Sequence, residues 1–99
     1  MSELTGRQKR FLRSLGQRLS PAAVVGKGGL SDRAIGNVAH LLADHELLKV
    51  RLPEGPVRKV LAAELALAVD AACVGVVGRT ALLYRPSEQL EPDKRIRLS

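Results

Sequence analysis

Strand-like and helix-like patterns alternate between residues 22 and 85, and this order limits the possible folds more than any other feature. Short apolar runs at residues 22–25, 48–52, 74–77 and 80–85 predict strands, and a Gly78-Arg79 loop predicts a hairpin between the last two. Residues 31–45 and 56–72 carry apolar side chains at helical spacing, with Pro56 at the first helical position. Strands joined through helices run parallel, whereas a hairpin pairs antiparallel. We therefore expect an α/β fold: a helix followed by β-α-β-α-β-β, with a four-stranded mixed sheet and both crossover helices on one face.

A further helix is predicted before the first strand. Thr5 and Gln8 have the spacing of a capping box, so the helix should start near Gly6 and end before the Ser20-Pro21 pair. Its apolar stripe consists of Phe11, Leu12, Leu15 and Leu19. Its opposite face carries Lys9, Arg10 and Arg13, with Arg7 and Arg18 beside them. We expect the stripe to pack on the rest of the domain and the other face to form a cationic ridge.

The length of 99 residues predicts one domain, which we place at residues 1–86. Residues 87–99 are mostly polar and should form a mobile tail or a loosely docked strand. No apolar run approaches the roughly 18 residues of a membrane helix, and the N-terminus lacks the apolar core of a signal peptide. A cytoplasmic protein is the expectation. The single cysteine, Cys73, lies in an apolar stretch and should be an inert core thiol.

The charge balance favours a polyanionic partner such as nucleic acid. Sixteen Lys and Arg residues oppose ten Asp and Glu residues, which gives a net charge of +6. The excess is local, because residues 1–30 hold six cationic residues and only Glu3 as an acid. A cationic helix face without interspersed carboxylates differs from an ordinary solvated face, so it indicates a binding surface.

The string Gly26-Lys27-Gly28-Gly29 is a G-x-x-G loop between a predicted strand and a predicted helix. Glycines let a phosphate approach the backbone, amides ahead of a helix N-terminus attract anions, and Lys27 adds a full charge. Loops of this kind clamp nucleic-acid backbone in KH-type domains. A tight turn without a ligand remains the alternative, since glycines between a strand and a helix often serve only that purpose. Neither the P-loop string nor the complete dinucleotide fingerprint occurs.

The sequence offers little for catalysis or metal binding. His40 and His45 are five residues apart, outside the spacing of a helical metal pair, and no nucleophile has a recognisable base. We expect no enzymatic activity, no cofactor, no metal and no small-molecule substrate. With only Phe11 and Tyr84 as aromatics, recognition of RNA should depend on phosphate, sugar and shape rather than on aromatic stacking. Arg79 and Arg85 are further candidates for RNA contact, with surface salt bridges as the alternative.

Four strings in fixed order resemble the CRS1-YhbY domain family, also called the CRM domain, in its bacterial single-domain form. These strings cover residues 4–13 (LTGRQKRFLR), 25–31 (VGKGGLS), 45–51 (HELLKVR) and 76–86 (VVGRTALLYRP). The resemblance implies a fold similar to the C-terminal domain of bacterial translation initiation factor three. It also implies RNA contacts on the G-x-x-G loop and the adjacent basic surface, which correspond here to residues 26–29 and to Arg7, Lys9, Arg10 and Arg13. The alanine-rich segment at residues 62–68 departs from the family pattern, so the helix containing it should add no cations beyond Arg58 and Lys59.

The resemblance further implies association with precursors of the large ribosomal subunit, while plant relatives are splicing factors for group II introns. The expected function is therefore that of a monomeric RNA-binding protein that contacts ribosomal RNA in those precursors during ribosome assembly, with no membrane partner. The alternative function is a protein-interaction module whose basic face docks on an acidic protein.

Overall fold

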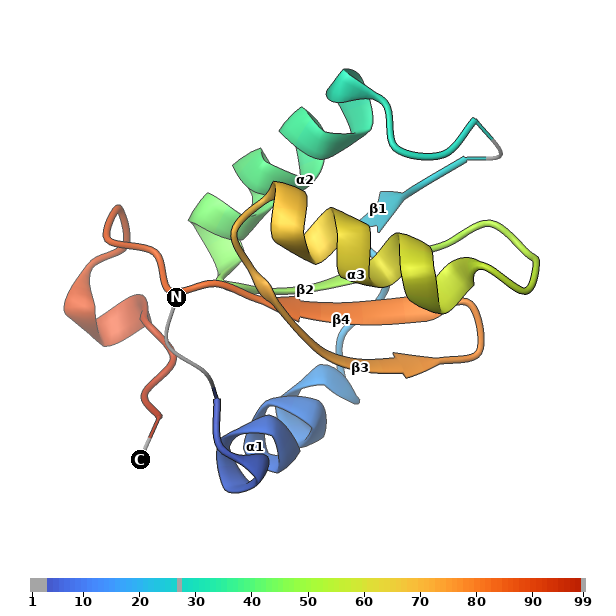
Figure 1. The fold of residues 1–99 in the computed structure, drawn as a ribbon. Coiled ribbons are helices and arrows are strands. Elements are labelled where there is room, and N and C mark those ends of the chain that lie inside the picture. Colours follow the sequence, from blue (N-terminus) through green and yellow to red (C-terminus); the bar gives the residue numbers. More distant parts are fainter. Residues whose placement is uncertain (1–3, 27, 99) are drawn as a thin grey trace.

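The computed structural model describes residues 4–26 and 28–98. Its elements are α1 (Gly6–Gly16), β1 (Ala23–Val24), α2 (Asp32–His45), β2 (Leu47–Arg51), α3 (Arg58–Ala68), β3 (Ala72–Val77), β4 (Thr80–Tyr84) and a 3-10 turn, η1 (Pro92–Lys94) (Figure 1). Among these residues, no helix has both the length and the apolar character needed to cross a membrane.

The four strands form one mixed sheet in the order β1-β2-β4-β3, which confirms the predicted fold class. β1 and β2 are parallel, while β2 and β3 each pair antiparallel with β4. The crossover through α3 therefore does not join neighbouring strands, because β4 lies between β2 and β3. The burial of β4 explains its central place: its last four residues are buried, with Ala81 and Leu83 facing one side and Leu82 and Tyr84 the other.

The sheet separates two hydrophobic cores. α2 and α3 cover one face, where Val38, Leu42 and Leu65 pack against Leu48 and Val50 of β2. α1 covers part of the other face, as Figure 1 shows, and Leu12 packs there with Leu47, Val74, Leu82 and Tyr84. The prediction that both crossover helices share a face is correct, and α1 forms a third layer.

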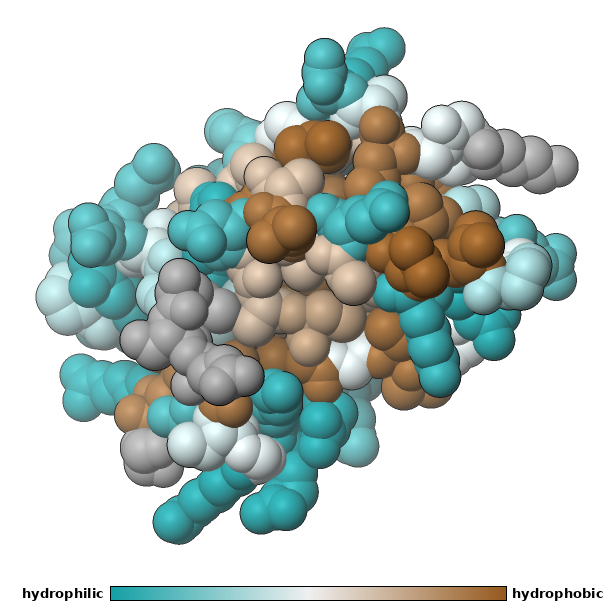
Figure 2. All heavy atoms as spheres, viewed as in Figure 1, coloured by the Kyte–Doolittle hydropathy of each residue, from teal (hydrophilic) through white to brown (hydrophobic). Residues whose placement is uncertain are grey.

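α3 is shorter than predicted at both ends. Pro56 lies in the preceding turn rather than at the first helical position, and Val57 precedes the first helical residue without a side-chain cap. The helix ends at Ala68, and Asp70 then adopts a left-handed backbone (φ 54°) that turns the chain into β3. The outer side of α3 exposes several large apolar side chains, Val57, Val60 and Leu67, beside the charged Lys59 and Glu64. Hydrophobic side chains accordingly gather over α3 in Figure 2, whereas hydrophilic ones extend from α1.

The C-terminal segment is docked on the domain, and its described residues, 87–98, contain no strand. Glu46, which ends α2 with a left-handed backbone (φ 59°), is only 1% exposed. Its carboxylate accepts hydrogen bonds from the backbone N–H groups of Ser87 and Ile96, both at 2.6 Å. The Ser87 hydroxyl donates to the Ala43 carbonyl at 2.6 Å, and Ile96 packs against the α1 core. Residues 87–98 are therefore docked on the domain through these contacts, and they do not form the loosely docked strand that was one of the two expected forms.

Candidate nucleic-acid interface

The glycine loop (residues 26–29) connects β1 to α2 as a tight turn. The N–H of Gly29 donates to the Gly26 carbonyl at 3.0 Å, so this amide is occupied within the loop. Gly29 has a positive φ of 78°, which favours glycine, whereas Gly26 and Gly28 are exposed with no heavy atom within 4 Å of an added Cβ. Lys27, the predicted cation of the loop, lies outside the described residues. The loop is thus a tight turn that also leaves an open surface at Gly26 and Gly28.

The first turn of α2 faces this loop across a depression of about 580 Å³. The Ser31 hydroxyl accepts the N–H of Ala34 at 3.1 Å and so caps the N-terminus of α2. The depression is lined by Val24, Gly26, Gly28, Gly29, Ser31, Arg33, Ala34 and Asn37. Arg33 and Asn37 are absent from the predicted site, although their spacing of four residues after an N-cap places them on one side of the helix.

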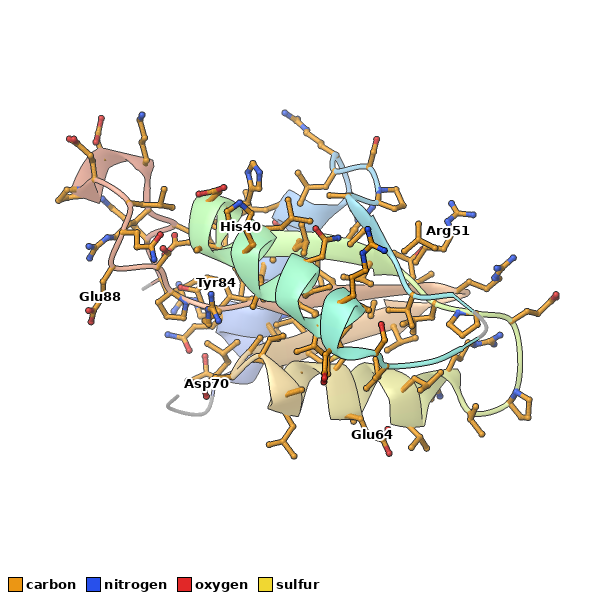
Figure 3. The ribbon with its side chains drawn as sticks, turned by 90° about the horizontal axis from the view of Figure 1, so that it is seen from above. His40, Arg51, Glu64, Asp70, Tyr84 and Glu88 are labelled. Carbon is orange, nitrogen blue, oxygen red and sulfur yellow. The ribbon has the colours of Figure 1, made fainter. Side chains whose placement is uncertain are left out.

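One row of side chains on the α1 face of the sheet is not covered by any described element. We call Val24, Arg51, Thr80 and Val77 the outer row. Their positions follow from the strand register, which pairs Val24 with Arg51, Arg51 with Thr80 and Thr80 with Val77. Val24 is 67% exposed and Val77 is 80% exposed, and Figure 3 shows Arg51 extending outward at the edge of the molecule. The row exists because α1 ends at Gly16, before it reaches this end of the sheet.

A second depression, of about 530 Å³, lies between α1 and the sheet. Its lining consists of Arg13, Gly16, Gln17, Lys49, Gly75, Val77, Thr80 and Leu82. Gly16 makes the close approach possible, because an added Cβ would lie 2.7 Å from a methyl carbon of Leu82. Lys49 and Leu47 are two residues apart on β2, and side chains alternate between the faces of a strand, so both point to the α1 face. Lys49 and Arg51 were not predicted as site residues, although this alternation is visible in the sequence.

Arg13 lies along the sheet, whereas the helical pattern predicted that it faces away. Its Nη1 donates to the Val74 carbonyl at 3.0 Å, and its aliphatic stem passes over Gly75. The cause is the contact at Gly16, which rotates the buried line of α1 toward Leu12 and Gly16. Arg10 remains exposed on the outer side of α1, as predicted.

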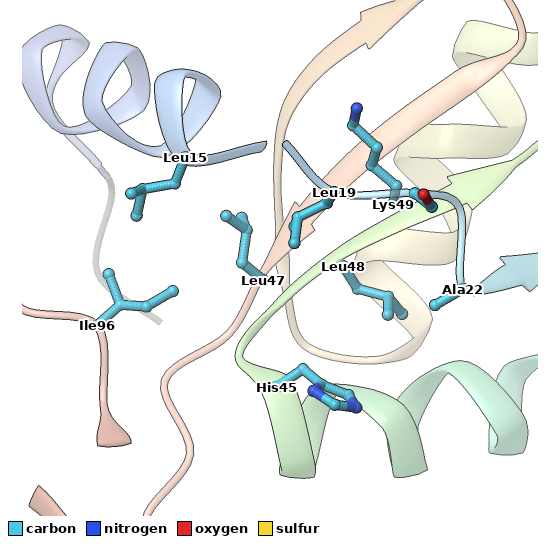
Figure 4. Close-up of a pocket in the computed structure, with 9 residues that line it drawn as sticks. Leu15, Leu19, Ala22, His45, Leu47, Leu48, Lys49 and Ile96 are labelled. Carbon is cyan, nitrogen blue, oxygen red and sulfur yellow. The ribbon is translucent and has the colours of Figure 1, made fainter. Parts of the chain in front are cut away.

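The same rotation leaves the predicted apolar stripe of α1 partly uncovered. Phe11, Leu15 and Leu19 are each 38–44% exposed, and only Leu12 of the stripe is fully buried. Leu15 and Leu19 form one wall of a depression of about 410 Å³, which is shown in Figure 4. The other residues that line it are Ser20, Ala22, His45, Leu47, Leu48, Lys49 and Ile96. Lys49 lines this apolar depression as well as the second one.

The remaining predicted cations have different positions. Arg7 and Arg10 are exposed on α1, and their side chains make no hydrogen bond or ion pair with the described residues. Arg79 donates from Nε to the Leu52 carbonyl at 3.3 Å and lines a depression beside the glycine loop that also includes Glu54. Arg85 lies on the other side of the sheet, where it donates to the carbonyls of Val69 (2.8 Å) and Ala39 (3.0 Å). Arg85 therefore joins α2 to α3 and stays outside the candidate interface.

Lys9 of α1 lies close enough to Cys73 of β3 for its charge to act on the thiol. Burial raises the pKa of the Cys73 thiol, and the positive charge of Lys9 opposes this rise. The raised pKa keeps the thiol protonated near neutral pH, in agreement with the expectation of an inert cysteine. Within the described ranges, no group of three or more His, Cys, Asp or Glu side chains could hold a metal ion.

The two depressions and the outer row form one continuous surface, which we call the basic track. Val24 belongs to both the loop depression and the outer row, while Thr80 and Val77 belong to both the outer row and the second depression. The cations of the track are Arg13, Arg33, Lys49 and Arg51. No carboxylate is found among these lining residues. The track therefore connects the glycine loop to α1, although they lie in different layers of the molecule.

The fold and the track define the class of protein: a small α/β domain that carries a glycine loop and a cationic surface whose lining residues include no carboxylate. More specifically, the chain belongs to the CRS1 / YhbY (CRM) domain family, whose model matches residues 4–85.

Relatives of known name agree with this membership. An RNA-binding protein of Haemophilus influenzae is 31% identical over 91 residues, which cover 90% of this chain and 92% of the relative. The Bacillus subtilis protein named "Probable RNA-binding protein YqeI" is 38% identical over 88 residues, covering 87% of this chain and 92% of the relative. The solution structure of SAV1595 from Staphylococcus aureus, described as a candidate RNA-binding protein, is 35% identical with a TM-score of 0.79, and the match covers 90% and 95% of the two chains.

Proposed function

We propose that this protein binds structured RNA through phosphate contacts along the basic track, and that its target is ribosomal RNA in precursors of the large ribosomal subunit. The observation that carries the RNA part is the track itself, in which four cations and an open glycine loop occur without a carboxylate. The relatives named for RNA binding support the same partner. The ribosomal target, a role in ribosome assembly, a cytoplasmic location and a monomeric state follow from the family resemblance and complete the proposal.

Each part of the track has a defined task in this proposal. The open backbone at Gly26 and Gly28 accepts one phosphate next to the N-terminus of α2, with Lys27 and Arg33 as its cationic partners. Lys49, Arg51 and Arg13 contact further phosphates, and the exposed Arg7 and Arg10 extend the surface along α1. Arg79 adds charge beside the loop, where Glu54 partly offsets it. Such a rigid set of cations favours a folded RNA whose phosphates match its spacing.

The phosphate contacts are tested by the salt dependence of RNA binding. If the track neutralises about five phosphates, the logarithm of the binding constant should fall against the logarithm of salt concentration with a slope of about −3.5 to −4.5. A slope near zero would contradict the proposal.

The loop is tested by substituting Gly28, where an added side chain meets no other atom and does not require a positive φ. We expect Gly28→Asp to weaken RNA binding by about tenfold or more, because it places a negative charge at the phosphate position. The matched control is Gly28→Asn, which has nearly the same shape without the charge and should retain most of the affinity. Equal affinities for wild type and Gly28→Asp would show that the loop is only a turn.

The ribosomal target is tested on a sucrose gradient of cell lysate at near-physiological salt. Wild-type protein should sediment with large-subunit precursors, whereas a variant with Arg7→Glu and Arg10→Glu should remain near the top. Nuclease treatment before sedimentation should release the wild-type protein. If the wild type stays at the top, or if nuclease-treated lysate still retains it on an acidic protein complex, the ribosomal proposal is wrong.

A further inference from the structure

The outer row exposes two large aliphatic side chains on the uncovered part of a sheet face that also carries Lys49 and Arg51. Val24 and Val77 are 67% and 80% exposed, and Arg51 and Thr80 lie between them in the same row. The Arg51 side chain makes no hydrogen bond or ion pair within residues 4–26 and 28–98, so its guanidinium is available to a ligand. A single exposed valine needs no explanation, but two in one row with a free guanidinium between them form an organised surface.

The charge around this row indicates which partner it can accept. Lys49 lies two residues before Arg51 on β2, Arg13 lines the same depression as Lys49, and neither the row nor the two depressions contain a carboxylate among the described residues. Glu54 and Arg79, which carry opposite charges, line a neighbouring depression that also includes Val24. A second copy of this chain, with its net charge of +6, would bring cations against cations. The surface therefore suits a ligand that combines negative charge with a flat, weakly polar group.

A nucleotide has this combination. Its phosphate carries the charge, and its base is a flat ring that stacks on a guanidinium plane as well as on an aromatic side chain. Bases inside an RNA duplex are already paired and stacked, so only an unpaired nucleotide can reach the row. The guanidinium of Arg51, which lies between Val24 and Thr80 in the row, can take the place of an aromatic side chain, because neither Phe11 nor Tyr84 belongs to the row.

We infer that the outer row is a stacking platform for one unpaired nucleotide of the bound RNA. The preferred target is then a helix with a bulged or looped-out nucleotide, whose neighbouring phosphates lie on the basic track. This inference rests on the proposed RNA binding and adds to it the structural class of the RNA. It also changes the expectation that stacking contributes little to recognition.

The test compares two hairpin RNAs of equal length and charge, one fully paired and one with a single bulged uridine. Wild-type protein should bind the bulged hairpin about tenfold more tightly, the usual contribution of one stacked base. Arg51→Lys keeps the positive charge but loses the planar guanidinium, so the ratio of the two affinities should fall to about one; the ratio is the readout, because Arg51 also contacts phosphate in the basic track. Val77→Ser should reduce the preference in the same direction, whereas Val60→Ser on α3, also at an exposed valine, should not.

A photo-crosslink gives a positional readout that does not depend on affinity. Thiouridine at the bulge should crosslink to peptides containing Val24, Arg51, Val77 or Thr80. Equal binding of both hairpins by the wild type, an undiminished preference in Arg51→Lys, or crosslinks confined to other elements would each overturn the inference while leaving phosphate binding intact. Failure of the wild type to bind either hairpin would instead refute the proposed RNA binding itself, and with it the inference.

Discussion

The buried carboxylate of Glu46 makes a sharp prediction about stability. Its two oxygens each accept a backbone N–H, one from Ser87 and one from Ile96, and its side chain is almost fully enclosed. Glu46→Gln preserves the size of the side chain but replaces one acceptor oxygen with an NH₂ group. That group would face a backbone N–H, so two donors would oppose each other.

The expected cost follows from these contacts. A hydrogen bond to a charged group contributes about 1.5–3 kcal/mol, and the substitution removes one such bond and replaces the charged acceptor of the other with a neutral one. We expect Glu46→Gln to lower the free energy of unfolding by about 2–4 kcal/mol. For a domain of this size, that loss corresponds to a fall in Tm of roughly 10–20 °C. Glu88→Gln, at the exposed carboxylate that points outward in Figure 3, should change stability by less than about 0.5 kcal/mol.

Urea unfolding of four proteins isolates the contact: the full chain and a chain that ends at Pro86, each with and without the Glu46→Gln substitution. The shortened chain lacks both N–H donors, so Glu46→Gln should cost little there. The resulting coupling energy should be about 2 kcal/mol, and RNA affinity of the folded proteins should not change, because Glu46 lies outside the basic track. The same cost in both backgrounds would show that the carboxylate does not hold the C-terminal segment.

Three other predictions concern single contacts. Burial, together with the nearby charge of Glu46, raises the pKa of Tyr84 above 10.0, so the native state favours the un-ionised phenol. The stabilisation by the un-ionised Tyr84 phenol is fully present below about pH 10 and is lost as pH rises through the folded-state pKa of Tyr84. Urea unfolding should therefore show that the free energy of unfolding falls above about pH 10 in the wild type and falls much less in Tyr84→Phe. Arg85→Met should lower the free energy of unfolding by about 2–3 kcal/mol without changing RNA affinity. Arg51→Met should lower RNA affinity without changing the free energy of unfolding. Denaturant melts and RNA titrations measure the two effects separately. Gly16→Val should destabilise the protein by about 2 kcal/mol in thermal melts, since even its Cβ would lie too close to Leu82.

Features fixed by local contacts could be predicted from the sequence. The capping box of α1 depends on Thr5 and Gln8, three residues apart, and the structure contains both of its hydrogen bonds. The predicted hairpin turn depends on Gly78, whose φ of 57° is readily adopted by glycine at the first position of a two-residue loop. The mixed sheet could be predicted from the order of strand and helix patterns along the chain, because each segment shows the apolar periodicity of its own type of secondary structure.

Features fixed by distant parts of the chain could not be predicted in this way. The end of α3 was misplaced because the apolar segment beyond Ala68 fits a helix as well as a strand, and the pairing of Ala72 with Tyr84 decides between them. Arg51 and Arg85 both follow apolar strand residues. Arg51 is exposed on the outer row, whereas Arg85 donates hydrogen bonds to the carbonyls of Val69 and Ala39. That difference depends on where α1 ends and how α2 and α3 approach each other.

The hydrogen bonds of Glu46 also affect how the family can vary in sequence. The family match stops at residue 85, but the partners of Glu46 are at positions 87 and 96. Because both partners are main-chain amides, any amino acid except proline can supply them. These two hydrogen bonds therefore place no demand on the side chains at positions 87 and 96, although the Ser87 hydroxyl and the Ile96 side chain make contacts of their own. A boundary drawn from sequence similarity would cut the chain before the segment that satisfies this buried acid.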